Sequence, residues 1–333
     1  MRSLLLALLL TLTVWDGPGR AAEQCPPLTI LGSEPMQIGV DGRIYVKATV
    51  NGAPVSMLVD TGGFFAELTP ALVSRLNLPT RHVRLRLIGL SGHSTDIAVS
   101  APFALGNMHA DGMDFMVMPA DHAFAPDVPD AGGILAPNLF RHYDLDLDIA
   151  GHRLQLISQD HCDGKVVYWK ANALAEVPVR IAPTGHVLVP IGLDGHTLTA
   201  LLDTGATVSL LNMSVAQSQF GLMPDVPPRA RMSGAPPVAT HIFRALSFAG
   251  VAVSNPRLVM LPDLIHGKIS NAGAGAESRM PDVILGMDIL RHLHLYIAYK
   301  EQKLYITPAD VPPPADVPPP ATAATAAAVH PPK

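Results

Sequence analysis

The apolar stretch Val55–Val59 (VSMLV) runs directly into the triplet Asp60-Thr61-Gly62, and residues 198–202 (LTALL) run in the same way into Asp203-Thr204-Gly205. A hairpin signal precedes each stretch, Asn51-Gly52 in the first and Asp194-Gly195 in the second. In both copies the aspartate comes eight residues after the turn glycine. The common spacing indicates an internal repeat rather than two chance occurrences of a short triplet.

The repeat extends well beyond the two triplets. A short helix is expected nine residues after each aspartate, with Thr69 and Asn212 as N-caps and Gly221 as a helix stop. Residues 134–142 line up with residues 284–292, and a short helix is predicted in the later part of each. The remaining predicted strands are Arg43–Val50, Tyr143–Ile149 and Arg153–Ile157 in the first half, and Val187–Leu193, Leu198–Leu202, Leu293–Tyr299 and Lys303–Ile306 in the second.

Short strands separated by frequent turns are typical of an all-β protein. The chain of 333 residues, 48% of them hydrophobic, is long enough for two lobes with substantial cores. We therefore predict two similar lobes. The expected boundaries are 22–162 for the first lobe, 163–176 for the linker and 177–307 for the second lobe.

The two ends of the sequence differ from the body. Residues 1–21 combine a positive start, an apolar run over 4–14 and small residues before Ala21, which is the layout of a secretory signal peptide. An uncleaved membrane anchor and a lipid anchor on Cys25 are the alternatives. Residues 308–333 are rich in Pro and Ala and are expected to be a disordered tail. The protein is thus expected in the periplasm or outside the cell, without stable membrane insertion.

The charge and the cysteine content of the sequence limit the functions and the covalent cross-links that the protein can have. Only 15% of residues are charged and the formal net charge is −5, which does not give the basic surface that nucleic-acid binding requires. The sequence has two cysteines, Cys25 and Cys162. After export they can form a disulfide, and two separate free thiols are the alternative.

The two triplets place a carboxylate at the tip of an apolar strand, where it is poorly solvated and needs hydrogen-bond partners. The threonine hydroxyl and the unobstructed glycine backbone can provide them. Each triplet alone is also compatible with a structural turn in which the aspartate caps its own backbone. Two copies in matching positions favour a shared chemical role.

The sequence resembles the retropepsin-like branch of the pepsin-type aspartic peptidases, in a tandem form with two fused lobes. The resemblance covers roughly residues 36–307 and rests on both triplets and on Val283-Ile284-Leu285-Gly286. It implies two β-barrel lobes related by a pseudo-twofold axis, with Asp60 and Asp203 facing each other as a catalytic dyad. It also implies that Thr61 and Thr204 interlock, and that Gly62 and Gly205 donate backbone N–H groups to the carboxylates.

The resemblance implies an exported endopeptidase that acts on peptides or proteins as a monomer, with no cofactor and no metal. Two carboxylates share one proton and activate a water molecule. One alternative keeps the fold without the chemistry, as a catalytically silent peptide-binding module of the cell envelope. Another pairs lobes from different chains. Flap candidates are Gly89, Ser91 and Gly92 in the first lobe, and Ser233 and Gly234 in the second; neither segment has the tyrosine of pepsin-like flaps.

Two departures from the family pattern affect the site. Gly63 follows the first triplet, where the family prefers Ser, Thr or Ala, and Ala206 follows the second. Neither offers a hydroxyl to the carboxylate, so an activity optimum less acidic than that of digestive relatives is expected. The first lobe has Ala136 where the second has Gly286. The added methyl is expected to crowd the packing beneath Asp60, with Gly132 and Gly133 as the nearby residues that can compensate.

Other possible sites have simpler explanations. Asp144, Asp146 and Asp148 alternate with aliphatic residues, which predicts that the aspartates face water rather than a metal ion. A pair formed by His292 and His294 on one strand face is a second conceivable metal site. Most of the 14 histidines are expected to be solvated. Signatures of zinc peptidases, nucleotide-binding loops and serine hydrolases are absent from the sequence.

Overall fold

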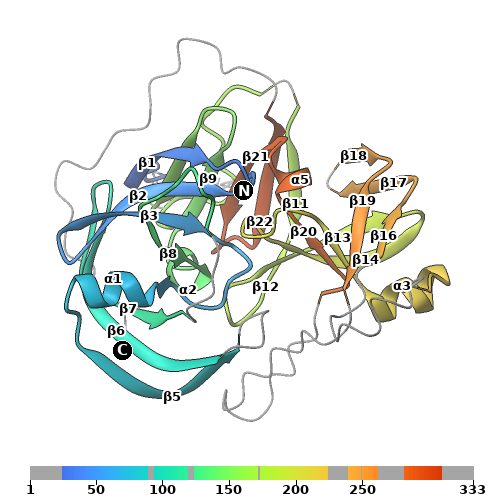
Figure 1. Ribbon diagram of the computed structural model, residues 1–333. Coiled ribbons are helices and arrows are strands. Elements are labelled where there is room, and N and C mark those ends of the chain that lie inside the picture. The colour runs from blue at the N-terminus through green and yellow to red at the C-terminus, as the bar shows by residue number, and fades with distance from the viewer. Residues whose placement is uncertain are drawn as a thin grey trace, which may run out of the picture.

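The computed structural model describes residues 25–88, 94–118, 124–171, 173–223, 239–248, 250–261 and 281–309. Strands dominate, helices are short, and two lobes lie side by side with a common sheet between them (Figure 1). The predicted signal peptide, both flap candidates and the tail from residue 310 onward lie outside the described residues. Within those ranges, no helix has the length and apolar character needed to span a bilayer.

The first lobe is a strongly curved sheet around an apolar core. Its strands follow the order β2-β3-β8-β4-β7-β6-β5, and an additional β2–β6 pairing closes the curve. The elements are β2 (Ile44–Val50), β3 (Ala53–Val59), β4 (Glu67–Leu68), α1 (Pro70–Arg75), β5 (Thr80–Ile88), β6 (Ser94–Leu105), β7 (Met108–Val117), β8 (Ala131–Leu135) and α2 (Pro137–Phe140).

The second lobe repeats this plan, and several of its strands are shorter than those of the first. Its order is β16-β19-β15-β20-β14-β13-β17-β18, with β12 paired to β13. The elements are β12 (Arg180–Ile181), β13 (Val187–Leu193), β14 (His196–Leu202), β15 (Leu210–Asn212), α3 (Met213–Phe220), β16 (Ala239–Ile242), β17 (Ala245–Phe248), β18 (Val251–Ser254), β19 (Arg257–Leu261), β20 (Val283–Leu285) and α5 (Met287–Leu290).

Six strands, three from each half of the chain, form the sheet that joins the lobes. Their order is β11-β22-β21-β9-β10-β1, so the pseudo-twofold axis passes between β9 and β21 (Figure 1). The antiparallel pair β9–β21 places Leu295 opposite Leu147 at the centre. The bounds are β1 (Ile30–Ile38), β9 (Asp144–Asp148), β10 (Arg153–Ile157), β11 (Ala175–Pro178), β21 (Leu293–Ala298) and β22 (Lys303–Pro308).

The turns and caps that the sequence predicts are confirmed. Asn51-Gly52 and Asp194-Gly195 join β2 to β3 and β13 to β14, and all four residues have positive φ, as a two-residue hairpin turn requires. The side chain of Thr69 accepts a hydrogen bond from the backbone of Leu72 at the start of α1. The Asn212 side chain caps α3 in the same way, and Gly221 ends that helix with a φ of 64°.

The prediction that the aspartates of β9 face water is wrong for two of the three. Asp144 and Asp146 are 0% and 1% exposed, whereas Asp148 keeps part of its surface in water and caps the backbone N–H of Gly151. The reason is that residues 161–169 fold over this face of the shared sheet. Period-two alternation identifies two faces of a strand, but it does not say that the polar face is solvated when a distant segment covers it.

A buried polar layer results at the back of the shared sheet. The Nε2 atom of His161 lies 2.6 Å from a carboxylate oxygen of Asp144, and Nε2 of His294 lies 2.6 Å from one of Asp146. The Trp169 ring stacks on His294 with 4.2 Å between ring centroids. His161, His186 and His294, each 7% exposed, are thus exceptions to the expectation that most histidines are solvated.

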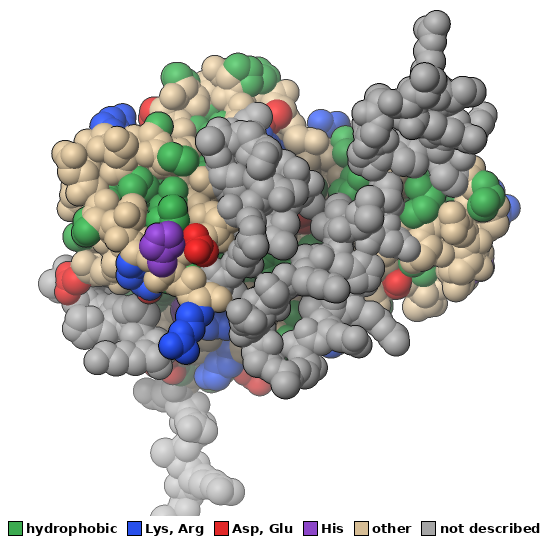
Figure 2. Space-filling view, turned by 60° about the horizontal axis from the view of Figure 1, so that its bottom comes forward, with side chains coloured by type: hydrophobic (Ala, Val, Ile, Leu, Met, Phe, Trp, Pro, Cys, Tyr) green, Lys and Arg blue, Asp and Glu red, His purple; other side chains and the backbone are tan. Residues whose placement is uncertain are grey.

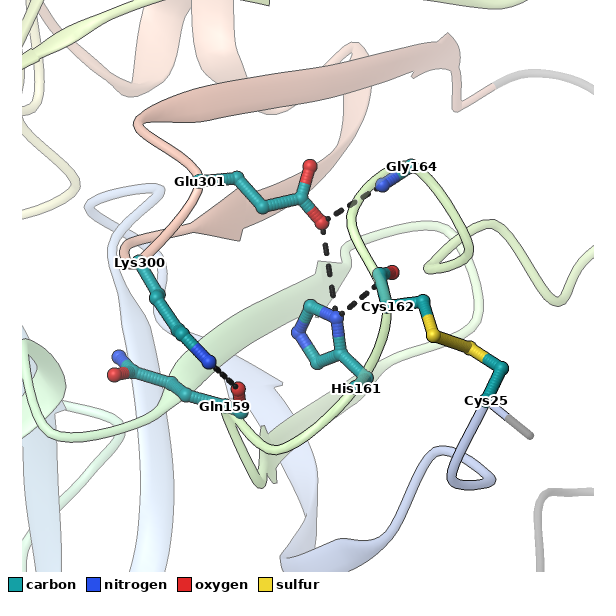
Figure 3. The surroundings of a disulfide bond; sticks show 7 residues. All are labelled: Cys25, Gln159, His161, Cys162, Gly164, Lys300 and Glu301. Carbon is teal, nitrogen blue, oxygen red and sulfur yellow. Dashed lines mark hydrogen bonds and ion pairs between the residues drawn. A yellow bond between two sulfur atoms is a disulfide. The ribbon is translucent and has the colours of Figure 1, made fainter. Parts of the chain in front are cut away.

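A disulfide between Cys25 and Cys162 anchors the start of the described chain next to this covering segment. Figure 3 shows Glu301, from the second lobe, pointing toward the same loop. A carboxylate oxygen of Glu301 accepts a hydrogen bond from the backbone N–H of Gly164 at 3.1 Å and lies 3.7 Å from Nδ1 of His161. The N-terminus, the inter-lobe segment and the second lobe are thus tied together at one place.

Candidate active site

The two aspartates of the repeated triplets are held by equivalent backbone hydrogen bonds. Strand β3 runs parallel to β8, and the N–H of Asp60 donates to the carbonyl of Leu135 at 2.9 Å. In the second lobe β14 runs parallel to β20, and the N–H of Asp203 donates to the carbonyl of Leu285 at 3.0 Å. The parallel neighbours therefore fix both aspartates at the strand ends where the lobes meet.

The threonines of the two triplets interlock across the lobe interface. The backbone N–H of Thr61 donates to Oγ1 of Thr204, and the N–H of Thr204 donates to Oγ1 of Thr61, both at 3.1 Å. Each hydroxyl then donates onward to a strand carbonyl of the opposite lobe, at 2.8 Å to Leu202 and at 2.6 Å to Val59. Because both threonines are 1% exposed, these four hydrogen bonds fix the relative position of the two loops in a site without competing water.

The glycines of the triplets leave room for the aspartate of the other lobe. A Cβ atom added to Gly62 would lie 2.2 Å from Cγ of Asp203, and one added to Gly205 would lie 2.4 Å from Cγ of Asp60. Each glycine N–H also donates to the carboxylate of its own triplet at 2.9 Å. Glycine is required here for close approach, because any side chain would occupy the space of a carboxyl group.

The two carboxyl groups are joined by a hydrogen bond to each other. Burial raises the pKa of Asp60, while the hydrogen bond from Asp203 and the N–H of Gly62 act in the opposite direction. Burial raises the pKa of Asp203 well above its ordinary value, and the neighbouring charge of Asp60 adds to this effect. Both residues keep part of their surface accessible to solvent. Such a pair retains one proton in conditions where separate carboxyls would have lost both.

The lobes differ in the position of one methyl group under these loops. In the second lobe the methyl belongs to Ala206, and a Cβ on Gly286 would lie 2.6 Å from the backbone of Val208. In the first lobe the methyl belongs to Ala136, and a Cβ on Gly63 would lie 3.4 Å from it. The expected crowding by Ala136 is thus relieved by the absence of a side chain at Gly63.

Gly132 and Gly133, which were expected to relieve that crowding, face other groups. An added Cβ on Gly132 would meet Val55 and Leu72, and one on Gly133 would meet Met57 and the carbonyl of Glu67. These glycines let the core of the first lobe close around β8 instead.

The loops beside the aspartates are supported by different side chains in the two lobes. In the second lobe the hydroxyl of Ser209 donates to a carboxylate oxygen of Asp288 at 2.6 Å and accepts from the N–H of Gly286 at 3.0 Å. In the first lobe the side-chain oxygen of Asn138 accepts from the N–H of Ala66 at 2.7 Å. A charged acceptor in one lobe thus corresponds to a neutral one in the other.

One histidine of the second lobe contacts the active-site loop of the first. The Nε2 atom of His186 lies 3.0 Å from the carbonyl oxygen of Gly62, and its Nδ1 lies 2.6 Å from the hydroxyl of Thr184. The ring packs edge-on against Phe64 with 4.8 Å between centroids. Burial lowers the pKa of His186, and hydrogen bonding to the loop and the charge of Asp60 act against this shift.

A third carboxyl group lies near Asp60. Glu67 is on β4, between β7 and β8, and its pKa is raised to about 8, first by burial and then by the negative charge of Asp60. The matching position in the second lobe is Leu210. The first-lobe loop thus has an acid at a position where the second lobe has an aliphatic residue.

The structure brings the predicted residues of the two triplets together, and it adds two neighbours that sequence reasoning missed. His186 aligns with Arg43 of the first half, one residue after a turn glycine in each copy, and Glu67 aligns with Leu210. The sequence signal that could have identified His186 and Glu67 is that they differ from the residues at the matching positions of the other half. Among the described residues, no group of three histidine, cysteine or acidic side chains is arranged to hold a metal ion.

Comparison with known proteins gives a family match. A family model described as aspartyl protease matches residues 46–136 and 189–289, once in each lobe. Comparison with curated proteins finds no match. Similar solved structures include basic 7S globulin from soybean (12% identity, TM-score 0.48, covering 84% of this chain and 95% of that one) and conglutin gamma from lupine seeds (13%, 0.47, 85% and 95%). The aspartic proteinase from Irpex lacteus is similar at 13% identity and a TM-score of 0.48, covering 84% of this chain and 97% of that one.

Proposed function

The chain belongs to the aspartyl protease family, and we propose that it is an exported aspartic endopeptidase that hydrolyses peptide bonds with a water molecule activated between Asp60 and Asp203. The single observation that carries the proposal is the hydrogen-bonded carboxyl pair, contributed by two loops of one chain and still partly accessible to solvent. Because both acids come from the same chain, catalysis by a monomer needs no second copy.

The protonation state of the pair supports this chemistry. Burial raises the pKa of both acids, so the pair holds one proton, which the proposed mechanism places on Asp203 beside an ionised Asp60. Asp60 takes a proton from the water as its oxygen attacks the peptide carbonyl, and Asp203 gives its proton to the carbonyl oxygen. When the resulting gem-diol collapses, Asp60 protonates the leaving amine and a diol hydroxyl returns a proton to Asp203. The carbon–nitrogen bond breaks, and the pair ends with the one proton it held at the start.

The surroundings of the pair predict a mildly acidic activity optimum. Asp203 accepts backbone hydrogen bonds from Gly205 and Ala206, and neither Gly63 nor Ala206 brings a hydroxyl to a carboxylate. Burial is the first cause of the raised pKa of both acids. Since one acid must ionise for water activation, peak activity below about pH 3 would contradict this expectation.

Export is the second part of the proposal. A disulfide is consistent with an extracellular or periplasmic protein, and the basic start and apolar run of residues 1–21 support a cleaved signal peptide. N-terminal sequencing of the mature protein should find Ala22 as its first residue, because the predicted cleavage point follows Ala21. A mature chain that still begins at Met1 would contradict cleavage.

The catalytic assignment is tested with two single variants, Asp60→Asn and Asp203→Asn, assayed on a library of internally quenched peptides. We expect each to lose activity by about 10³-fold or more, because each removes one of the two proton-transfer groups. Asp111→Asn, which changes an exposed acid on β7, is the matched control and should retain full activity. A statine-type inhibitor should block the wild-type protein.

The same experiment separates the proposal from its alternative, a peptide-binding envelope module with this fold. That alternative is motivated by the unusual first lobe, with Gly63 after its triplet and Ala136 in place of glycine. A wild-type protein that binds peptides and the inhibitor but cleaves nothing between pH 3 and pH 8 would favour the binding module. Retained cleavage in either Asp→Asn variant would contradict the assignment of Asp60 and Asp203 as a catalytic pair.

A further inference from the structure

The contact between His186 and the loop after Asp60 crosses from one lobe to the other at the reacting groups. His186 precedes β13 of the second lobe, while Gly62 belongs to the triplet of the first. Gly62 donates its own N–H to Asp60 at 2.9 Å, so its peptide groups connect the imidazole to the carboxylate. A residue at this place can act on Asp60 without touching the substrate.

The hydrogen bonds determine the tautomer of His186. A carbonyl oxygen can only accept, so Nε2 must carry a proton to bond the carbonyl of Gly62 at 3.0 Å. In the neutral ring Nδ1 is then an acceptor, and the hydroxyl of Thr184 must be its donor at 2.6 Å. The ring is 7% exposed, so water does not compete for either hydrogen bond.

The charged groups around His186 come from several elements. Asp60 is the charged neighbour on the first-lobe loop that acts directly on the imidazole, and it is bonded in turn to Asp203. Glu67 acts on the same loop through Asp60. Arg141, which follows α2 in the first lobe, donates from its guanidinium to the carbonyl of Pro183 at 3.0 Å, and Pro183 lies on the turn that carries His186. Phe64 and Thr184, which touch the ring, are uncharged.

We propose that His186 is a cross-lobe positioning residue for Asp60, which holds the carbonyl of Gly62 so that the backbone N–H of that glycine stays directed at the Asp60 carboxylate. This inference rests on the proposed peptidase function and adds a residue to it. It predicts that loss of the His186 hydrogen bond affects the protonation of Asp60 in the free enzyme. The first half has Arg43 at the equivalent position, so the first lobe has no histidine that corresponds to His186.

The main test compares His186→Phe with the wild-type protein. Phe keeps an aromatic ring against Phe64 but removes both hydrogen bonds. We expect kcat to fall by about 10-fold to 10²-fold with KM nearly unchanged, and the acidic limb of the kcat/KM profile to move to higher pH, because Asp60 loses support for its ionised form. Active sites are counted by titration with a tight-binding statine inhibitor, so that a misfolded fraction does not count as reduced kcat.

Two further variants keep the proposal testable if His186→Phe fails to fold. His186→Gln retains an N–H donor and should recover part of the activity and of the acidic limb. Thr184→Val removes the donor to Nδ1 and should produce a smaller shift of the profile in the same direction. His196→Gln, on the far end of β14 from Asp203, is the matched control and should leave kcat and the profile unchanged.

The outcomes distinguish this inference from the function on which it rests. Active wild-type protein with an unshifted pH profile in His186→Phe and Thr184→Val would overturn the inference and leave the peptidase assignment intact. A wild-type protein that cleaves no peptide would overturn the proposed function, and the positioning role with it. A shifted acidic limb with partial rescue by His186→Gln supports the inference.

Discussion

The two active-site loops have the same backbone and different neighbours. Each triplet follows a strand that pairs in parallel with a neighbour, β3 with β8 in the first lobe and β14 with β20 in the second. The threonine of each triplet also accepts a hydrogen bond from the backbone N–H of the other threonine. The second-lobe loop is supported by Ser209 and the charged Asp288, whereas the first-lobe loop has a neutral Asn138 and an extra acid, Glu67. The shared features are those that place the carboxyls, and the differences lie in groups that tune them.

This comparison suggests that duplication preserved the geometry and allowed the two carboxyls to take different roles. Burial raises the pKa of both acids and the two carboxyls are adjacent, so the pair holds a single proton although the backbone around it is symmetric. His186 and Glu67 both act on the Asp60 side. The aspartate of the first lobe, whose motif departs more from the family pattern, therefore interacts with two further side chains.

The largest effect is expected where the lobes are most alike, at the two triplet glycines. Gly62→Ala or Gly205→Ala would place a methyl within 2.2 Å or 2.4 Å of the opposite carboxyl carbon, so the acids must separate. We expect peptide cleavage to fall by about 10²-fold or more in each variant, since small misplacements of reacting groups are costly. Activity assays and thermal unfolding measure the effect.

Gly164→Ala is the control for this pair. Gly164 has a positive φ of 73°, which Gly62 and Gly205 do not have, and nothing lies within 4 Å of a Cβ added there. It should lose about 1 kcal/mol of stability and no activity. Equal loss of activity in all three variants would contradict the account of close approach.

A smaller effect is expected where the lobes exchange a methyl group. Gly286→Ala would place its Cβ 2.6 Å from the Val208 backbone, and we expect a loss of about 1–3 kcal/mol of unfolding free energy. Gly63→Ala would place its Cβ 3.1 Å from an oxygen of Asp60 and 3.4 Å from Ala136, which is a milder conflict. Urea unfolding of each variant gives the comparison.

The double variant Gly63→Ala/Ala136→Gly tests whether the two positions compensate. It moves the methyl to the place it has in the second lobe, where Ala206 and Gly286 stand. The double-mutant cycle should therefore give a favourable coupling of about 0.5–1 kcal/mol or more. Strict additivity would show that the two positions are independent.

The last effect depends on pH and concerns Glu67→Gln, which removes the acid that the first lobe has on β4. The folded-state pKa of Glu67 is about 8 against an ordinary value of 4.5, so the stability from its retained proton is present below about pH 4.5 and is lost as the pH rises through about 8. The variant should match the wild type in stability at pH 4 and exceed it at pH 9 by several kcal/mol, at most about 5 kcal/mol.

Leu210→Gln at the matching position of the second lobe is the control for Glu67→Gln. It introduces the same amide into the equivalent strand without removing a titratable group, so any loss of stability should be independent of pH. If the difference in stability between the wild-type protein and Glu67→Gln is the same at pH 4 and at pH 9, Glu67 has an ordinary pKa.

The sequence predicted the parts of the fold that depend on neighbours along the chain. Asn51-Gly52 fixes a hairpin by its own φ angles, and Thr69 caps a helix by reaching three residues ahead. The site could be predicted because the repeat doubled a weak triplet into a strong signal. Local hydrogen bonding and a repeated spacing thus account for the hairpins, the caps and the residues of the dyad.

Features that depend on distant segments were not predictable in this way. The burial of Asp144 and Asp146 depends on residues 161–169 folding over the shared sheet, and the contact of His186 with Gly62 depends on the docking of one lobe on the other. The surface of the molecule shows a related limit. Figure 2 shows basic, acidic and uncharged side chains interspersed on one face. Their positions on this face could not be predicted from the composition of the sequence.

The central claim is that Asp60 and Asp203 hold one proton between them, and carboxyl-carbon NMR of selectively labelled protein across a pH titration tests it most directly. We predict that one proton leaves the pair well above the ordinary range of aspartate, and that the Asp60→Asn variant lowers the pKa of Asp203 by removing the neighbouring charge. Two carboxyls that titrate independently near pH 4, unaffected by substitution of the other, would contradict the claim.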